Sequence, residues 1–138
     1  MLTEKWLNRW LNMCDQVAAW SNCPRAQVGS FIIKDNQPIS QGFNGPPKGA
    51  ARLCGGSKCE RDTLNIKSGT STEIGCQAAK NGIALDGATL IVNCEPCLSC
   101  SKLIHHSGIS LVIIGGRGYS KAGIEYLEKQ GVKIKVML

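Results

Sequence analysis

Residues 89–100 read TLIVNCEPCLSC. An apolar run comes first, and Pro96 then stands between Glu95 and Cys97, with Cys100 three residues after Cys97. The first four residues have the length and β-branched content of a buried strand. Pro96 suits the first turn of a helix, and apolar residues continue at helical spacing over residues 97–106. The stretch therefore predicts a strand that runs directly into a helix, with Cys97 and Cys100 at the junction.

Helix and strand patterns flank this junction on both sides. A helix is predicted over residues 3–20, because apolar residues recur there at three- and four-residue steps. We expect this apolar stripe in the core: Trp6, Trp10, Met13, Val17 and Trp20. Further strands are predicted at 28–34, 39–43, 111–114 and 132–136, further helices at 72–81 and 120–130, and loops at 44–71 and 115–118. A hairpin followed by alternating helix and strand predicts an α/β fold: a three-layer α/β/α arrangement with a mixed five-stranded sheet.

Length and composition limit the class of protein. The 138 residues, 43% of them hydrophobic, suffice for one core, so residues 1–138 are expected to form a single domain. No run of about 18 apolar residues and no signal peptide are recognised, so we expect a cytoplasmic protein with no membrane partner. Thiols are kept reduced there, which favours metal binding over disulfides for the two close pairs among the eight cysteines, Cys97 with Cys100 and Cys54 with Cys59.

The net charge of +6 is spread along the chain and fits phosphate-bearing small molecules as well as nucleic acid. Only 5% of the residues are aromatic, so stacking platforms for single strands are sparse and a nucleic-acid partner is not expected. A solvated basic surface with no partner explains the charge equally well.

The C-x-x-C pair is the strongest chemical signal. Two thiolates at a helix start lie within reach of one tetrahedral zinc ion, and the helix N-terminus favours the thiolate form. A redox pair is the main alternative, but Pro96 stands before the cysteines rather than between them. A catalytic zinc also needs a third protein ligand, an open position for water, and a carboxylate to transfer protons. We expect the ligand and the carboxylate on the preceding helix.

Five short segments occur in an order that resembles one known family. They are Cys23-Pro24-Arg25, Gly42–Pro47, Ala78–Gly82, Gly87–Leu90 and Glu95–Cys100. Together they resemble the cytidine/deoxycytidylate deaminase superfamily, most closely its deoxycytidylate deaminase branch, over nearly the whole chain. The resemblance implies a cytidine-deaminase-like fold, catalytic Zn²⁺, a homo-oligomer, and hydrolytic conversion of a pyrimidine nucleotide, dCMP, to dUMP in nucleotide metabolism.

The family's [H/C]-A-E signature, which supplies a zinc ligand and the general acid/base, is not intact here. One placement puts Ser71-Thr72-Glu73 on it, so that Glu73 is the catalytic residue and Cys76, one helical turn later, replaces the missing histidine as ligand. The other placement anchors on Ala78–Gly82, and both functional residues are then missing. Cys76 also fits a buried thiol or a partner of the loop cysteines.

The resemblance suggests further site residues. A second, structural zinc is implied for Cys23, Cys54 and Cys59. The family's loop at residues 42–47 contacts nucleotide, which makes Asn44 a candidate substrate-binding residue, although Asn-Gly is also a strong turn dipeptide. Arg25 and Arg117 are candidates for the phosphate.

Two other functions fit the same residues. A deaminase-fold protein that binds zinc or nucleotide without turnover would explain the altered signature. A deaminase acting on bases in nucleic acid is a second alternative, which the few aromatic residues argue against.

Overall fold

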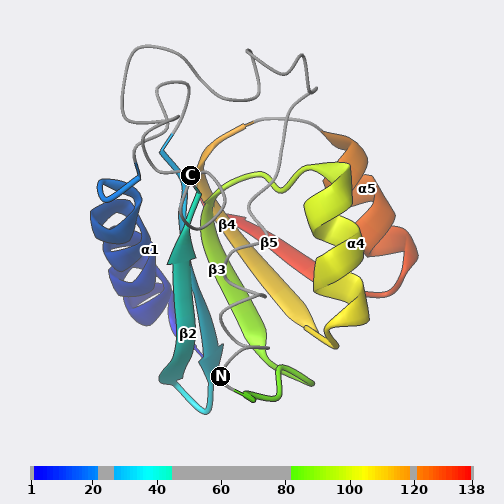
Figure 1. Cartoon of the computed structure of the whole chain (residues 1–138), viewed down its shortest axis with the longest axis horizontal. Helices are drawn as coiled ribbons and strands as arrows, with labels where there is room; N and C mark the ends of the chain where they lie inside the picture. The colour runs from blue at the N-terminus through cyan, green and yellow to red at the C-terminus, as the bar shows by residue number, and fades with distance from the viewer. Residues whose placement is uncertain (1, 22–26, 45–81, 119–120, 138) are drawn as a thin grey trace.

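A sheet lies between one helix on one face and two helices on the other (Figure 1). The computed structural model describes residues 2–21, 27–44, 82–118 and 121–137. Its elements in chain order are α1 (Glu4–Ala18), β1 (Gly29–Lys34), β2 (Gln37–Phe43), β3 (Thr89–Cys94), α4 (Leu98–His106), β4 (Leu111–Arg117), α5 (Lys121–Lys129) and β5 (Lys133–Met137). The helix predicted at 72–81 lies outside the described residues.

The sheet is mixed and has five strands in the order β2-β1-β3-β4-β5. Strand β1 runs antiparallel to both β2 and β3, whereas β3, β4 and β5 are parallel to one another. This confirms the predicted mixed five-stranded sheet. It also places the end of β2, the start of β1 and the ends of β3 and β4 at one edge of the sheet.

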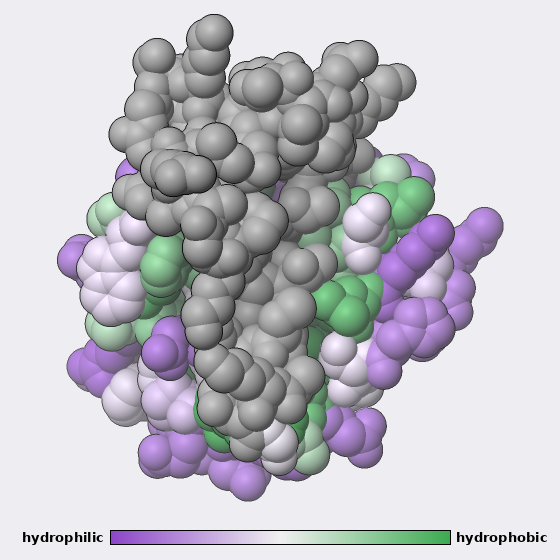
Figure 2. Space-filling model, viewed as in Figure 1, coloured by the Kyte–Doolittle hydropathy of each residue, from purple (hydrophilic) through white to green (hydrophobic). Residues whose placement is uncertain are grey.

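Alternation along the strands divides the core into two halves. On one face, Ile32, Leu90 and Val112 pack with residues of α4 and α5. On the other, Phe31, Ile91 and Ile113 pack with residues of α1. Hydrophilic side chains gather on the side of the molecule formed by α4 and α5 (Figure 2), although Leu98 and Leu103 of α4 are also exposed there. Among the described residues, no helix is long and apolar enough to cross a membrane.

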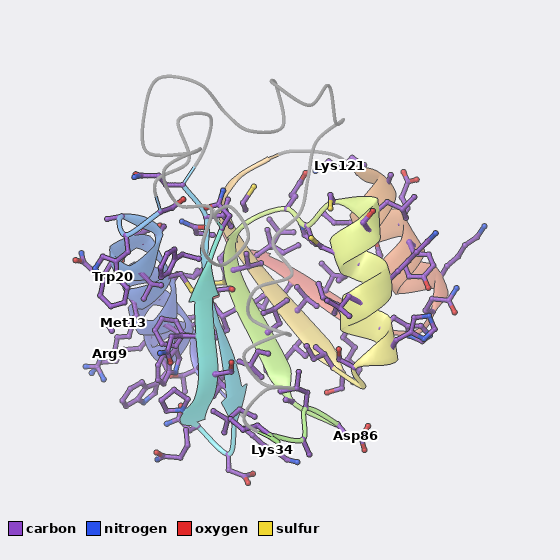
Figure 3. The ribbon with its side chains drawn as sticks, viewed as in Figure 1. Arg9, Met13, Trp20, Lys34, Asp86 and Lys121 are labelled. Carbon is purple, nitrogen blue, oxygen red and sulfur yellow. The ribbon has the colours of Figure 1, made fainter. Side chains whose placement is uncertain are left out.

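Helix α1 contacts the sheet mainly through small and medium side chains, and of its tryptophans Trp10 packs against the core, with its ring centroid 5.7 Å from that of Phe31 in β1. Thr3 caps the helix, and the buried residues are Leu7, Cys14, Val17 and Ala18. The expectation of a core stripe was wrong for Trp6, Met13 and Trp20, which are 40%, 46% and 63% exposed. Figure 3 shows Met13 on the side of α1 turned away from the sheet, whereas Trp20, after the end of α1, meets Phe43 of β2 edge-on with ring centroids 6.1 Å apart.

The close approach of α1 to β1 explains why several large side chains of this segment lie outside the core. A Cβ placed on Gly29 would collide with the carbonyl oxygen of Cys14 and lie 2.7 Å from the backbone nitrogen of Ala18. Backbones this close leave no space for an indole at the contact. The large side chains therefore lie at the margin or on the outer face of the helix.

Three strands are longer than predicted, and β3 is one of them because it continues from residue 92 to Cys94. Strand β2 begins at Gln37, because Asp35 and Asn36 both adopt positive φ and close the hairpin in two residues. Pro38 is tolerated because β2 is an edge strand. Strand β4 continues to Arg117, so the predicted loop at 115–118 was wrong for its first three residues.

Candidate active site at the Cys97–Cys100 turn

Cys97 lies between a strand and a helix, as predicted. Strand β3 ends at Cys94, and Cys97 is the N-cap of α4, with its Sγ accepting a hydrogen bond from the backbone N–H of Cys100 at 3.3 Å. Pro96 precedes the cap rather than occupying the first helical turn. We call residues 95–100, which run from Glu95 into the first turn of α4, the cysteine turn.

The cysteine turn favours the ionised form of Cys97. A hydrogen bond from the Cys100 side chain, assisted by backbone N–H groups, lowers the pKa of Cys97 from an ordinary 9.0 to about 6 despite partial burial. The N-terminus of α4 also favours a negative charge at this position. By contrast, burial and nearby Asp15 raise the pKa of Cys14 to about 12. Cys97 is thus suited to metal binding, whereas Cys14 is a buried thiol that stays protonated near neutral pH.

Packing from α4 and α5 holds the cysteine turn in place. Ser101, which is fully buried, donates its hydroxyl proton to the carbonyl oxygen of Cys97 at 2.8 Å. Gly123 of α5 lies against the same turn, since a Cβ there would collide with the carbonyl oxygen of Pro96 and lie 2.5 Å from Ser101 Oγ. The turn is therefore enclosed by two helices.

Glu95 is a buried charged residue that the sequence analysis did not single out. Its side chain is 6% exposed and forms an ion pair with Nζ of Lys121, the first residue of α5. Lys121 lies at the end of α5 nearest the cysteine turn (Figure 3). The sequence did contain a signal for this role: Glu95 stands between a strand predicted to be buried and Pro96-Cys97. A carboxylate buried at such a position requires a partner for its charge.

Asn44 lies at the same edge of the sheet, directly after β2. It is buried, its Oδ1 accepts from the N–H of Val28 at 2.9 Å, and its carbonyl oxygen accepts from the Ser21 hydroxyl at 2.7 Å. The first bond holds the end of β2 beside the start of β1, and the second joins it to the segment that follows α1. A structural role for Asn44 is therefore present, and a nucleotide contact would be additional to it.

Arg117 ends β4, where its backbone pairs with Cys94 of β3. The fold thus brings Asn44, the cysteine turn and Arg117 to one edge of the sheet. The other candidates lie outside the described residues: Glu73, Cys76, Cys23, Cys54, Cys59 and Arg25.

The two thiols fit part of a zinc site. Two thiolates at the N-cap and in the first turn of one helix suit Zn²⁺, and the lowered pKa of Cys97 favours the charge state that zinc requires. Within residues 2–21, 27–44, 82–118 and 121–137, no three His, Cys, Asp or Glu side chains converge as metal ligands. The described residues therefore offer two candidate ligands at this turn, and any further protein ligand would have to come from other parts of the chain.

Comparison with known proteins identifies similar sequences. The family described as "Cytidine and deoxycytidylate deaminase zinc-binding region" matches residues 4–116. The deoxycytidylate deaminase of Mycobacterium phage D29 is 35% identical over 126 residues, covering 82% of this chain and 96% of that protein. An "Uncharacterized deaminase in luxG 3'region" from Aliivibrio fischeri is 32% identical over 135 residues, covering 98% of this chain and 86% of the relative.

Solved structures share the fold. The crystal structure of dCMP deaminase from the cyanophage S-TIM5, in complex with dCMP and dUMP, has a TM-score of 0.78 and 23% sequence identity, covering 99% of this chain and all of that one. This similarity confirms the predicted cytidine-deaminase-like arrangement of the sheet and its helices.

Proposed function

Because this chain belongs to the cytidine and deoxycytidylate deaminase family, we propose that it is a hydrolase that deaminates dCMP to dUMP. The observation that carries the proposal is the cysteine turn. A thiol with a lowered pKa caps a helix there, at the sheet edge where Asn44 and Arg117 also lie. A relative that is 35% identical over 126 aligned residues carries the name deoxycytidylate deaminase, which favours a cytosine nucleotide as substrate.

Cys97 and Cys100 would hold a catalytic Zn²⁺, with Cys76 as the proposed third ligand. When bound, Zn²⁺ supplies the Lewis acidity that makes water a nucleophile near neutral pH. In the overall reaction, a water oxygen forms a bond to C4 of cytosine, the bond from C4 to the amino nitrogen breaks, and ammonia leaves. Glu73 is the proposed proton carrier between the water, the ring and the leaving nitrogen.

The remaining roles extend the same proposal. Asn44 would contact the nucleotide, and Arg25 and Arg117 would bind its phosphate. Cys23, Cys54 and Cys59 would hold a second, structural zinc. We also propose a single-domain homo-oligomer acting in the cytoplasm.

A specific observation favours one alternative, a deaminase-fold protein without turnover. The [H/C]-A-E signature is not intact in residues 71–82. Such a protein would retain zinc and nucleotide binding, because the cysteine turn is present, while lacking the proton carrier.

Turnover of dCMP by the purified zinc-loaded chain separates the two functions. The ultraviolet change from cytosine to uracil, with ammonia release as a second readout, should follow dCMP addition and should disappear in Cys97→Ser/Cys100→Ser. CMP and deoxycytidine serve as substrate controls for the sugar and the phosphate. Absence of turnover in protein with full zinc occupancy would contradict the enzyme proposal and support the alternative.

A further inference from the structure

We propose that Glu95 is a positioning residue for the zinc site, acting through its ion pair with Lys121. This inference rests on the proposed function and adds residues that hold the cysteine turn. In this arrangement Lys121, in the first turn of α5, holds the Glu95 side chain through the ion pair. Glu95 then restricts the backbone that carries the Cys97 thiolate.

The burial of Glu95 is the first argument. Its side chain is 6% exposed, whereas the Lys121 side chain is 71% exposed. A carboxylate removed from water requires a compensating partner, and leaving such a charge unpaired is strongly unfavourable. The ion pair therefore matters more here than an exposed pair would.

The packing of α5 is the second argument. Lys121 and Gly123 belong to the same helical turn, and both contact the cysteine turn: one through the ion pair, the other by close approach to Pro96. A negative charge is also favoured at the N-terminus of α5. Lys121 thus contacts Glu95 and Gly123 contacts Pro96, so one turn of α5 holds two consecutive residues of the cysteine turn.

The placement of Glu95 argues against a role as a metal ligand. Glu95 does not converge with Cys97 and Cys100 as a group of three potential ligands in the described part of the chain. It contacts Lys121 instead, and its Oε2 lies 3.9 Å from where a Cβ on Gly118 would be. Glu95 therefore acts through the backbone of the cysteine turn.

Metal affinity in the purified full chain tests the role. Glu95→Gln keeps the shape of the side chain and removes its charge, and Glu125→Gln removes an exposed acid of α5 as a matched control. Competition with a chromophoric chelator should show zinc affinity about 10–100-fold weaker in Glu95→Gln. Substitution with Co²⁺ should also show altered ligand-field and thiolate-to-cobalt absorption in this variant, with the Glu125→Gln spectrum unchanged.

Variants at Lys121 keep the test decisive if Glu95→Gln does not fold. Lys121→Met removes the exposed partner of Glu95 and should weaken zinc affinity. Lys121→Arg keeps a positive charge for the ion pair and should retain zinc affinity near that of the wild type. Lys129→Met is the control for loss of a positive charge on α5. Thermal unfolding of each metal-free variant separates weaker metal binding from loss of folded protein.

Two failures can be told apart. Wild-type zinc affinity and cobalt spectra in folded Glu95→Gln or Lys121→Met would overturn this inference and leave the proposed function standing. Absence of zinc binding in the wild-type protein would overturn both.

Discussion

At Cys97, the local hydrogen bonds should make one thiol far more reactive than its buried counterpart. The pKa of Cys97 is lowered to about 6 by the Cys100 side chain and backbone donors, whereas burial raises the pKa of Cys14 to about 12. Since the thiolate is the nucleophile, iodoacetamide should modify Cys97 in metal-free protein at pH 7 while Cys14 stays unmodified. Peptide mass spectrometry would measure both.

The rate at which Cys97 is alkylated should depend on pH through the ionisation of its thiol. The rate of Cys97 alkylation should reach half its maximum near pH 6. Because folding lowers this pKa, the thiolate stabilises the folded metal-free protein; the contribution is complete above pH 9.0 and is lost as the pH falls through about 6. A rate that rises only near the ordinary thiol pKa would contradict the described hydrogen bonding.

Individual residues differ in how far the sequence reveals their roles. The spacing of Cys97 and Cys100 is a local property and predicts their place at a helix start. Glu95 depends on Lys121, 26 residues later, so its burial and its ion pair require the tertiary fold. The hydrogen bond between Asn44 and Val28 likewise joins two strand ends that only sheet pairing brings together.

Among the elements, α5 should be the most sensitive to an added methyl group at its contact with the cysteine turn. On helix propensity alone, Gly123→Ala should stabilise α5 by about 1 kcal/mol. The new Cβ would nevertheless collide with the carbonyl oxygen of Pro96. Overpacking should therefore dominate and lower the free energy of unfolding by about 1–3 kcal/mol, as measured in urea.

Gly118→Ala, in the segment between β4 and α5, is the control for an added methyl group that meets no close neighbour. A Cβ at Gly118 would lie 3.9 Å from Glu95 Oε2, an ordinary van der Waals contact. Its stability should stay near that of the wild type. Equal stability of the Gly118 and Gly123 variants would refute the close packing of α5 on the cysteine turn.

Elements with strong local patterns were predictable to within a residue or two. Strand β3 and helix α4 follow from an apolar run and a proline beside a capping cysteine. Sequence pattern was less informative for α1, where the close contact at Gly29 selects small side chains and leaves Trp20 exposed. The extension of β4 through Gly115 and Gly116 depends on pairing with its neighbours, which overrides the loop preference of glycine.

For the whole molecule, topology determines where chemistry can occur. Three parallel strands and an antiparallel pair bring the end of β2 and the ends of β3 and β4 to one edge of the sheet (Figure 1). The sequence predicted this architecture from the order of its elements. It also placed Glu73 and Cys76 on the helix before β3, and that assignment remains a prediction because these residues lie outside the described part of the chain.

Zinc content measured by elemental mass spectrometry, alongside protein concentration, tests the central claim most directly. The wild-type chain purified without chelators should carry one or two zinc ions per molecule, and Cys97→Ser/Cys100→Ser should carry one fewer while circular dichroism confirms its fold. A wild-type protein without zinc, or a folded double variant with unchanged zinc content, would contradict the assignment of the cysteine turn as the metal site.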